Sequence, residues 1–102
     1  MSICFIIPAY KPTLELLDVV GELKVCPQTH LIVVDDGNPD QSFFEHRVFK
    51  GVTLLHHAVN RGKGAALKTG YDYALTHFAD LKGCITLDAD GQHHGEDVLK
   101  VL

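Results

Sequence analysis

The sequence predicts an α/β fold, in which helices cover both faces of an open, mainly parallel β-sheet. Two observations support this prediction. Four short apolar runs, rich in β-branched residues, alternate with stretches of helical periodicity. Because these runs are continuously apolar, they indicate strands that are buried on both faces, as in parallel sheets. The expected strands are residues 4–7, 31–34, 52–56 and 84–87.

The stretches between the strands predict helices, which gives the order β-α-β-α-β-α-β-α with right-handed crossovers. The first helix is expected directly after a Pro-Thr pair, which is a favourable helix start. A shorter helix is expected within residues 41–49, another over 64–78, and the beginning of a fourth over 95–102. The apolar stripe of the first helix consists of Leu14, Leu17, Val20 and Leu23.

The composition limits the kinds of partner. The 102 residues suffice for a single domain, 1–102, and a net charge of −4 argues against a general nucleic-acid binder. No apolar run approaches the ~20 residues that span a bilayer, and the amino terminus lacks the basic region of a signal peptide. Three cysteines without C-x-x-C spacing predict structural thiols and a reducing, cytoplasmic location. The apolar pattern of the last predicted helix suggests that the domain is truncated at its carboxyl end.

Acidic pairs follow two of the predicted strands, and the carboxyl ends of parallel strands meet at one edge of a sheet. Asp88 and Asp90, separated by Ala89, can hold one hard divalent cation, and that cation can hold a diphosphate. Asp35 and Asp36 can accept hydrogen bonds from a base or a ribose. The alternatives are ordinary loop acids and, for the second pair, a helix N-cap. Their position at strand ends favours a metal-dependent nucleotide site.

Two loops at the same edge add weaker signals, and neither has the spacing of a P-loop or a G-x-G-x-x-G motif. Residues 60–70 are rich in small residues and lead into a helix, so their backbone can approach an anion, and Lys63 adds positive charge. Gly70 inside that helix costs about 1 kcal/mol relative to alanine, which suggests close packing. Tyr10, after the first strand, is either a ring beside a nucleobase or a packed turn residue.

The histidines give less information. His93 and His94 follow the second acidic pair and raise zinc as a minor alternative, although adjacent loop histidines rarely form a site without further ligands. His56 and His57 are expected to be strand-end residues rather than catalysts.

Together, four segments of the chain resemble the donor-binding half of the family 2 glycosyltransferases, which have the Rossmann-like GT-A fold. Each segment is modest evidence alone, but the four stand in the right order at the ends of predicted strands. The resemblance covers nearly the whole chain, and it is closest to the polyprenyl-phosphate (dolichyl-phosphate mannosyltransferase-like) branch. The segments are residues 6–10 (IIPAY), 32–37 (IVVDDG), 60–66 (NRGKGAA) and 87–93 (LDADGQH).

The resemblance implies a role for each matching residue. The turn after the first strand and Asp35 would line the pocket of the nucleobase and ribose, with Asp36 supporting it, and Lys63 would hold the donor. Asp90 and Gln92 would reach a Mg²⁺ or Mn²⁺ ion, which acts as a Lewis acid, and Asp88 would lie against the ribose or the metal. The implied nucleotide-sugar site is Pro8, Ala9, Tyr10, Asp35, Asp36, Lys63, Asp88, Ala89 and Asp90, and the implied metal ligands are Asp90, Asp88 and Gln92.

The function that the resemblance implies is a metal-dependent, inverting transfer of a sugar from a UDP- or GDP-linked donor to a polyprenyl phosphate or a glycan. The reaction would take place in the cytoplasm or at the cytoplasmic face of a membrane, in a monomer or a homo-oligomer. The catalytic base is expected beyond Leu102, so none is named. Two departures from the family pattern are Lys11-Pro12, where many relatives carry Asn-Glu, and Asn38, where serine is usual.

Two other functions compete with this one. The first is a catalytically incomplete module that binds a nucleotide or a partner chain. The second is a receiver-like phosphoacceptor domain, because paired acids at strand ends also bind magnesium there. A receiver needs a lysine on a later strand, and the sequence shows none at the expected place.

Overall fold

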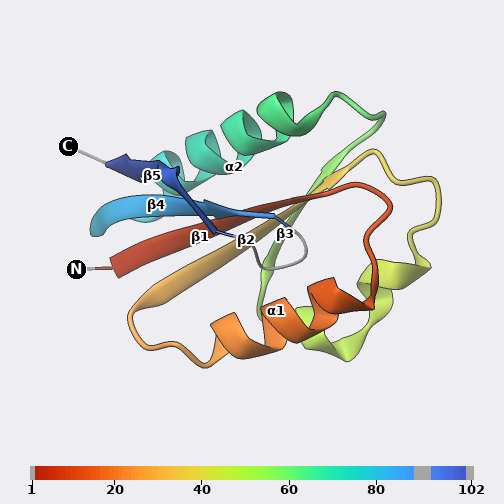
Figure 1. The fold of residues 1–102 in the computed structure, drawn as a ribbon, viewed down its shortest axis with the longest axis horizontal. Coiled ribbons are helices and arrows are strands. Elements are labelled where there is room, and N and C mark those ends of the chain that lie inside the picture. The colour runs from red at the N-terminus through yellow and green to blue at the C-terminus, as the bar shows by residue number, and fades with distance from the viewer. Residues whose placement is uncertain (1, 89–92, 101–102) are drawn as a thin grey trace.

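A five-stranded sheet with the strand order β3-β2-β1-β4-β5 forms the centre of the protein (Figure 1). The structure is a computed structural model that describes residues 2–88 and the backbone of residues 93–100. The first four strands pair in parallel, as the continuously apolar runs predicted, and β5 pairs antiparallel with β4. The strands are β1 (Ser2–Ala9), β2 (Thr29–Asp36), β3 (Thr53–His57), β4 (Leu81–Leu87) and β5 (His93–Lys100).

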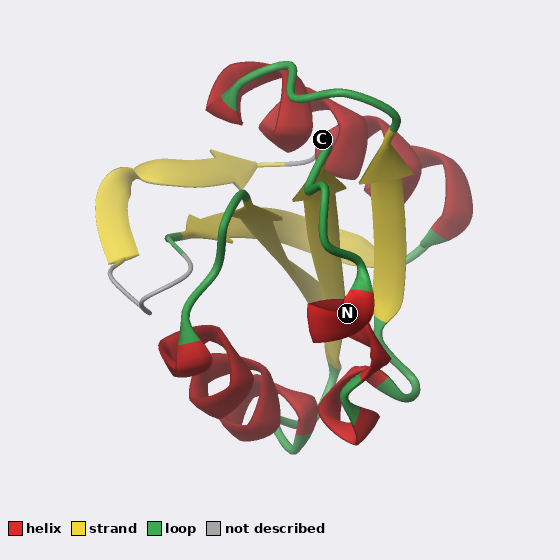
Figure 2. Ribbon diagram, turned by 90° about the vertical axis from the view of Figure 1, so that its right-hand side faces the viewer, coloured by secondary structure: helices red, strands yellow, loops and turns green. Residues whose placement is uncertain are grey.

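Helices cover both faces of the sheet, which confirms the predicted architecture (Figure 2). One face carries α1 (Leu14–Lys24) and two short 3₁₀ helices, η1 (Ser42–Glu45) and η2 (Arg47–Phe49). The other face carries α2 (Lys63–His77). In the described part of the chain, no helix is long and apolar enough to cross a membrane.

The central strands contribute side chains to two cores, one under each helix layer. Ile7 and Val33 are register partners that pack on the α1 side, whereas Ile6 and Ile32 are partners on the α2 side. Successive residues of a strand point to opposite faces, so a strand covered on both faces must be apolar at every position. This requirement explains the uninterrupted apolar runs in the sequence.

Helix α2 packs closely on the sheet through the small residues Ala66, Gly70 and Ala74, which are all buried. A Cβ atom at Gly70 would lie 2.6 Å from Cγ2 of Ile6, so only glycine fits there without a shift. The close packing that was predicted from a glycine inside a helix is therefore confirmed.

The predicted fourth helix is wrong where the structure describes it, because the backbone of 95–100 belongs to strand β5. There Val98 pairs with Ile85 and Leu99 pairs with Cys84. Without β5, the backbone N–H and C=O groups on this side of β4 would be left at a sheet edge. An eight-residue apolar pattern does not by itself distinguish a helix from a strand, and the available edge of β4 decides the outcome.

Two further details of the helix predictions need correction. In α1 the buried side chains are Leu16 and Val20, while Leu14 is 74% exposed. At about 100° per residue, Leu14 lies roughly 160° around the helix from Leu16, so the two cannot share a face. The helix expected within residues 41–49 is two 3₁₀ turns, because His46 between them has an extended backbone.

Candidate functional site

The carboxyl ends of the parallel strands gather the predicted site residues at one edge of the sheet. A pocket of about 230 Å³ opens there between the end of β1, the loop that follows β3 and the amino terminus of α2. Parallel α/β sheets bind ligands at this edge because the loops after the strands converge there. The pocket is lined by Pro8, Ala9, Tyr10, Asp36, Asn60, Gly62, Lys63 and Asp88.

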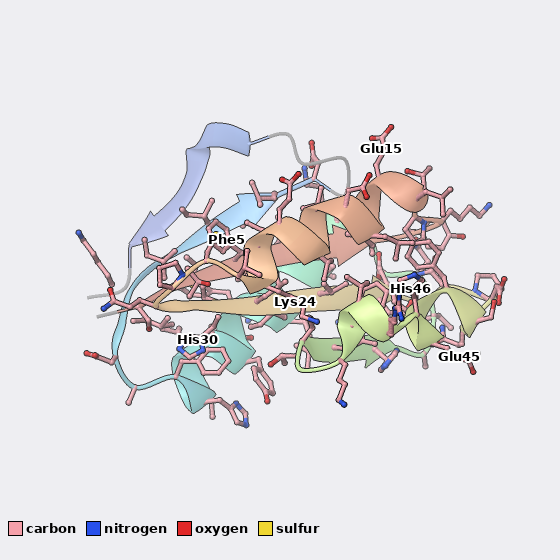
Figure 3. All side chains as sticks on the ribbon, turned by 90° about the horizontal axis from the view of Figure 1, so that it is seen from below. Phe5, Glu15, Lys24, His30, Glu45 and His46 are labelled. Carbon is pink, nitrogen blue, oxygen red and sulfur yellow. The ribbon has the colours of Figure 1, made fainter. Side chains whose placement is uncertain are left out.

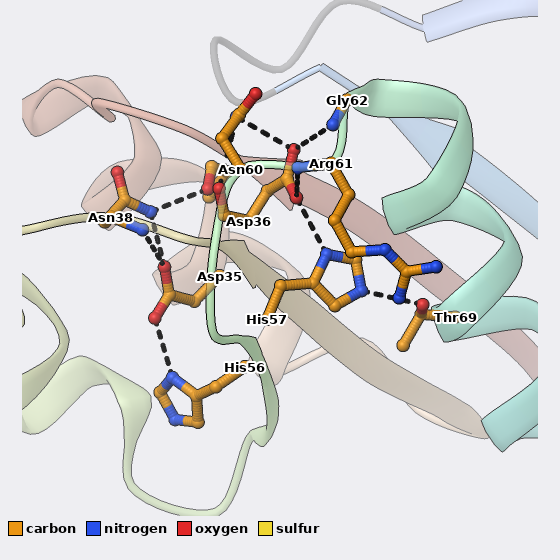
Figure 4. A network of polar contacts seen from close by, with 10 residues as sticks. Asp35, Asp36, Asn38, His56, His57, Asn60, Arg61, Gly62 and Thr69 are labelled. Carbon is orange, nitrogen blue, oxygen red and sulfur yellow. Dashed lines mark hydrogen bonds and ion pairs between the residues drawn. The ribbon is translucent and has the colours of Figure 1, made fainter.

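Asp36 organises the wall of this pocket. The residue is buried, and its two carboxylate oxygens accept hydrogen bonds from the backbone N–H groups of Arg61 and Gly62, both at 2.9 Å (Figure 4). The side-chain amide of Asn60 donates to the same carboxylate at 3.1 Å, and His57 Nδ1 lies 2.7 Å from it. Asp36 therefore fixes the glycine-rich loop to the end of β2.

Asp35 is fully buried and holds the neighbouring turn in the same way. Its carboxylate accepts hydrogen bonds from the backbone N–H of Asn38 at 3.0 Å and the side-chain amides of Asn38 and Gln41 at 2.6 and 2.8 Å. His56 Nδ1 lies 2.7 Å from its second oxygen. Asn38 also donates to the Ala9 carbonyl at 2.8 Å, so the ends of β1 and β2 are connected through Asp35 and Asn38.

Both carboxylates are held in the ionised form. Burial alone would raise the pKa of Asp36, but hydrogen bonds from His57, Arg61 and Gly62 outweigh burial and lower that pKa below its ordinary value of 3.8. For Asp35, burial also acts to raise the pKa, and the hydrogen bonds from His56, Asn38 and Gln41 bring it below 3.8. Two buried anions at this edge thus serve as fixed acceptors for the backbone around the pocket.

Lys63 and Asp88 form an ion pair at the mouth of the pocket. Lys63 is the first residue of α2, and its Nζ lies 2.9 Å from Asp88 Oδ1 just after β4. Their side chains are 55% and 31% exposed, so both are within reach of a ligand. A helix amino terminus favours anions, and the ammonium group of Lys63 adds to this preference.

The structure brings six of the predicted site residues together, and it leaves four elsewhere or undescribed. Asp35 does not line the pocket, and its oxygens are already engaged by the turn after β2. Ala89, Asp90 and Gln92 lie outside the described residues, so their roles stay predictions. Among residues 2–88, no group of three or more His, Cys, Asp or Glu side chains is arranged to hold a metal. The six that line the pocket are Pro8, Ala9, Tyr10, Asp36, Lys63 and Asp88.

The sequence analysis missed the two histidine–aspartate pairs. In the parallel register of β2 and β3, Asp35 is the partner of His56 and Asp36 is the partner of His57. Two adjacent acids and two adjacent histidines at the ends of successive parallel strands are a signal that could have revealed this pairing. The prediction that His56 and His57 are strand-end residues is confirmed. In addition, each contacts one of the two buried carboxylates.

Two further pockets, formed by described residues, lie at the two edges of the sheet. One, of about 290 Å³, lies at the same edge between Lys11, Asn38, Asp40 and Phe43. The other, of about 180 Å³, lies at the opposite edge of the sheet, and its lining includes Lys24, His30 and Phe78. The rings of His30 and Phe78 stack there with a centroid separation of 3.8 Å. Figure 3 labels Lys24 and His30. Ligands of parallel α/β sheets bind at the carboxyl ends of the strands, so no ligand is expected in the pocket at the amino ends.

Comparisons with known proteins bear on the family and the fold of this chain. Glycosyl transferase family 2 matches residues 4–102 of the chain. An uncharacterized protein of Methanocaldococcus jannaschii is 38% identical over 101 residues, covering 99% of this chain and 40% of that protein. The polyprenol monophosphomannose synthase of Mycolicibacterium smegmatis is 33% identical over 103 residues, covering 95% and 38%. The chain thus spans about two fifths of the length of these relatives.

Among solved structures, the crystal structure of S. aureus TarS residues 1–349 superposes with a TM-score of 0.65 at 21% identity, covering 88% of this chain and 28% of that one. This likeness supports the fold. The family match extends over nearly all of the sequence, and the predicted resemblance is confirmed. The chain belongs to glycosyl transferase family 2.

Proposed function

We propose that this chain is the donor-binding part of a glycosyltransferase and that it holds a nucleotide-sugar in the pocket at the carboxyl edge of the sheet. The observation that carries the proposal is the pocket itself. Asp36 fixes one wall, and Lys63 and Asp88 face each other at the mouth. This arrangement offers acceptors, a cation and a helix amino terminus to one phosphorylated ligand.

In this proposal the nucleoside lies against the turn after β1. Tyr10 is 45% exposed and lines the pocket, so its ring is accessible to a base or ribose. Asp36 lines the pocket, but its carboxylate already accepts four hydrogen bonds, so we give it the role of holding the pocket wall. Asp35 has a supporting role, because it holds Asn38 and the β1–β2 junction. The resemblance suggests a direct contact between Asp35 and the nucleoside, and Asp35→Asn tests that assignment in the binding assay.

The diphosphate of the donor would lie between Lys63 and Asp88. An incoming phosphate would compete with Asp88 for the Lys63 ammonium, and the Asp88 oxygen that contacts Lys63 would then turn toward a divalent cation. Carboxylate oxygen is a donor that suits Mg²⁺ or Mn²⁺, so the described residue fits such an ion, and Asp90 and Gln92 would complete the set. When bound, the ion supplies a Lewis acid that neutralises charge on the leaving nucleoside diphosphate.

The acceptor is proposed from the relatives. The name of the M. smegmatis relative describes the synthesis of a polyprenol-linked mannose phosphate. For this chain we therefore propose a polyprenyl phosphate or glycan acceptor, transfer with inversion, and a site of action on the cytoplasmic side of a membrane. The catalytic base would come from the part of the relatives that this chain does not span.

Isothermal calorimetry with UDP, GDP and their sugar conjugates, with and without Mn²⁺, tests the proposal. We expect Lys63→Met to weaken the binding of the preferred nucleotide by about tenfold to hundredfold, because a charged hydrogen bond to phosphate is worth about 1.5–3 kcal/mol. Lys68→Met is the matched control, since Lys68 lies on the same helix but pairs with Asp72. Equal affinities in the two variants, or no binding of any nucleotide by the wild-type chain, would contradict the proposal.

A further inference from the structure

His57 connects α2 to the acid that shapes the pocket. Its Nδ1 lies 2.7 Å from Asp36 Oδ1, and its Nε2 lies 2.8 Å from the hydroxyl of Thr69 in α2. The side chains of His57 and Asp36 are only 5% and 3% exposed. Three elements, β2, β3 and α2, are therefore joined by one buried chain of polar contacts (Figure 4).

The direction of the hydrogen bonds between Asp36, His57 and Thr69 follows from which of their atoms can donate and which can accept. The Asp36 carboxylate is ionised and can only accept, so His57 Nδ1 must carry a hydrogen. In a neutral imidazole, Nε2 is then an acceptor, and the Thr69 hydroxyl donates to it. Asp36 thus selects the Nδ1–H tautomer, and the Thr69 hydroxyl supplies the donor that Nε2 needs in that form, in the manner of the outer groups that orient histidines elsewhere.

His57 differs from the other donors to Asp36 in the structural element to which it belongs. Among the described residues, four groups donate hydrogen bonds to the Asp36 carboxylate. Three of them, from Asn60, Arg61 and Gly62, belong to the loop that Asp36 holds. Only His57 belongs to the sheet. Oδ1 is shared by His57 and Arg61, while Oδ2 takes Gly62 and Asn60. His57 therefore fixes the carboxylate relative to the scaffold, and the carboxylate then fixes the loop.

We propose that His57, held in its Nδ1–H form by Asp36 and hydrogen-bonded at Nε2 by Thr69, is a positioning residue for the nucleotide site. Its contact sets the orientation of the Asp36 carboxylate, and through the N–H groups of Arg61 and Gly62 it sets where α2 begins and where Lys63 stands. This inference rests on the proposed function. His56 provides a comparison within the same strand, since its side chain is 49% exposed and it contacts Asp35, away from the loop.

The test removes one hydroxyl and keeps the volume of the side chain. Thr69→Val has the shape of threonine without its donor, and Thr69→Ser restores the donor. We expect Thr69→Val to stay folded and to weaken nucleotide binding in the calorimetric assay by about tenfold, a size typical of outer-shell partners. Thr69→Ser should bind within about threefold of wild type. Wild-type affinity in Thr69→Val, or equal weakening in both variants, would overturn the proposal.

A second measurement needs no ligand, so that its failure is distinct from a failure of the proposed function. Nitrogen-15 NMR of the His57 ring should show the Nδ1–H tautomer in the wild-type chain. Hydrogen exchange at the Arg61 and Gly62 amides should be about tenfold faster in Thr69→Val, while amides of the β1 core keep their wild-type rates. An Nε2–H tautomer, or unchanged exchange at both amides, would overturn the positioning role even if nucleotides bind. A wild-type chain that binds no nucleotide would overturn the proposed function and the role in binding together.

Discussion

Gly37 and Asn60 bring two loops into direct backbone contact at the edge of the pocket. A Cβ atom added at Gly37 would clash with the backbone nitrogen of Asn60, and Gly37 has a φ of +75°. The contact joins the turn after β2 to the loop before α2, next to the residues that Asp36 holds. Glycine is therefore required at this position both for its backbone conformation and for its lack of a side chain.

Gly37→Ala tests this requirement, with Gly51→Ala as the matched control. Gly51 also has a positive φ, +83°, but an added Cβ there meets nothing within 4 Å. We expect Gly51→Ala to lower the free energy of unfolding by about 1–2 kcal/mol, the cost of the left-handed conformation alone. Gly37→Ala should lower it by about 3 kcal/mol or more, because overpacking adds to that cost. Equal losses in urea unfolding would show that the loops separate easily.

Gly70 in α2 offers a second comparison, in which helix propensity and packing oppose each other. Alanine is the better helix former by about 1 kcal/mol, but a Cβ at position 70 would meet buried Ile6 at 2.6 Å. We expect packing to win, so that Gly70→Ala lowers the free energy of unfolding by about 1–2 kcal/mol. At Gly64, where nothing lies within 4 Å, the same substitution should be neutral or stabilising by up to about 1 kcal/mol. A Gly70→Ala variant more stable than wild type would contradict this account of α2 packing.

The buried acids predict how stability depends on acid pH. The folded state holds the pKa of Asp35 and Asp36 below the ordinary 3.8, against the effect of burial, through the hydrogen bonds that they accept. A depressed folded-state pKa gives stability that is present above the ordinary pKa and is lost as the pH falls toward the folded value. We therefore predict that the free energy of unfolding decreases as the pH is lowered through and below 3.8. Urea unfolding at a series of pH values measures this, and a constant or rising free energy would contradict it.

Much of the fold could be predicted from the sequence because the burial of a strand on both faces leaves a local signature. The four parallel strands and the packing of Gly70 follow from residue types along one segment. Strand β5 could not be predicted in this way, since its pairing depends on the free edge of β4. In α1 the predicted stripe is confirmed at Val20, which is buried, and at Leu17 and Leu23, which pack against the core. It was wrong at Leu14, which is exposed, and it left out the buried Leu16.

The candidate site shows the same division. The gathering of Asp36, Lys63 and Asp88 could be predicted, because strand ends in a parallel sheet share an edge. Adjacent acids and adjacent histidines at the strand ends hint at the pairing of Asp36 with His57, but which acid meets which histidine depends on the register between β2 and β3, which core packing sets in three dimensions. The role of Thr69 depends in addition on how α2 lies across the sheet, and no pattern along the chain contains that information.

The most direct test of the central claim is a titration of the isotope-labelled chain with UDP and with GDP, each with Mg²⁺, followed by backbone amide chemical shifts. We predict that one nucleotide shifts the amides around the pocket most strongly, at Tyr10, Gly62 and Lys63. The amides of Gly51 and Phe78, which line the pocket at the opposite edge, should stay unchanged and serve as the internal control. Shifts centred on Gly51 and Phe78, or no shifts with either nucleotide, would contradict a nucleotide site at the carboxyl edge of the sheet.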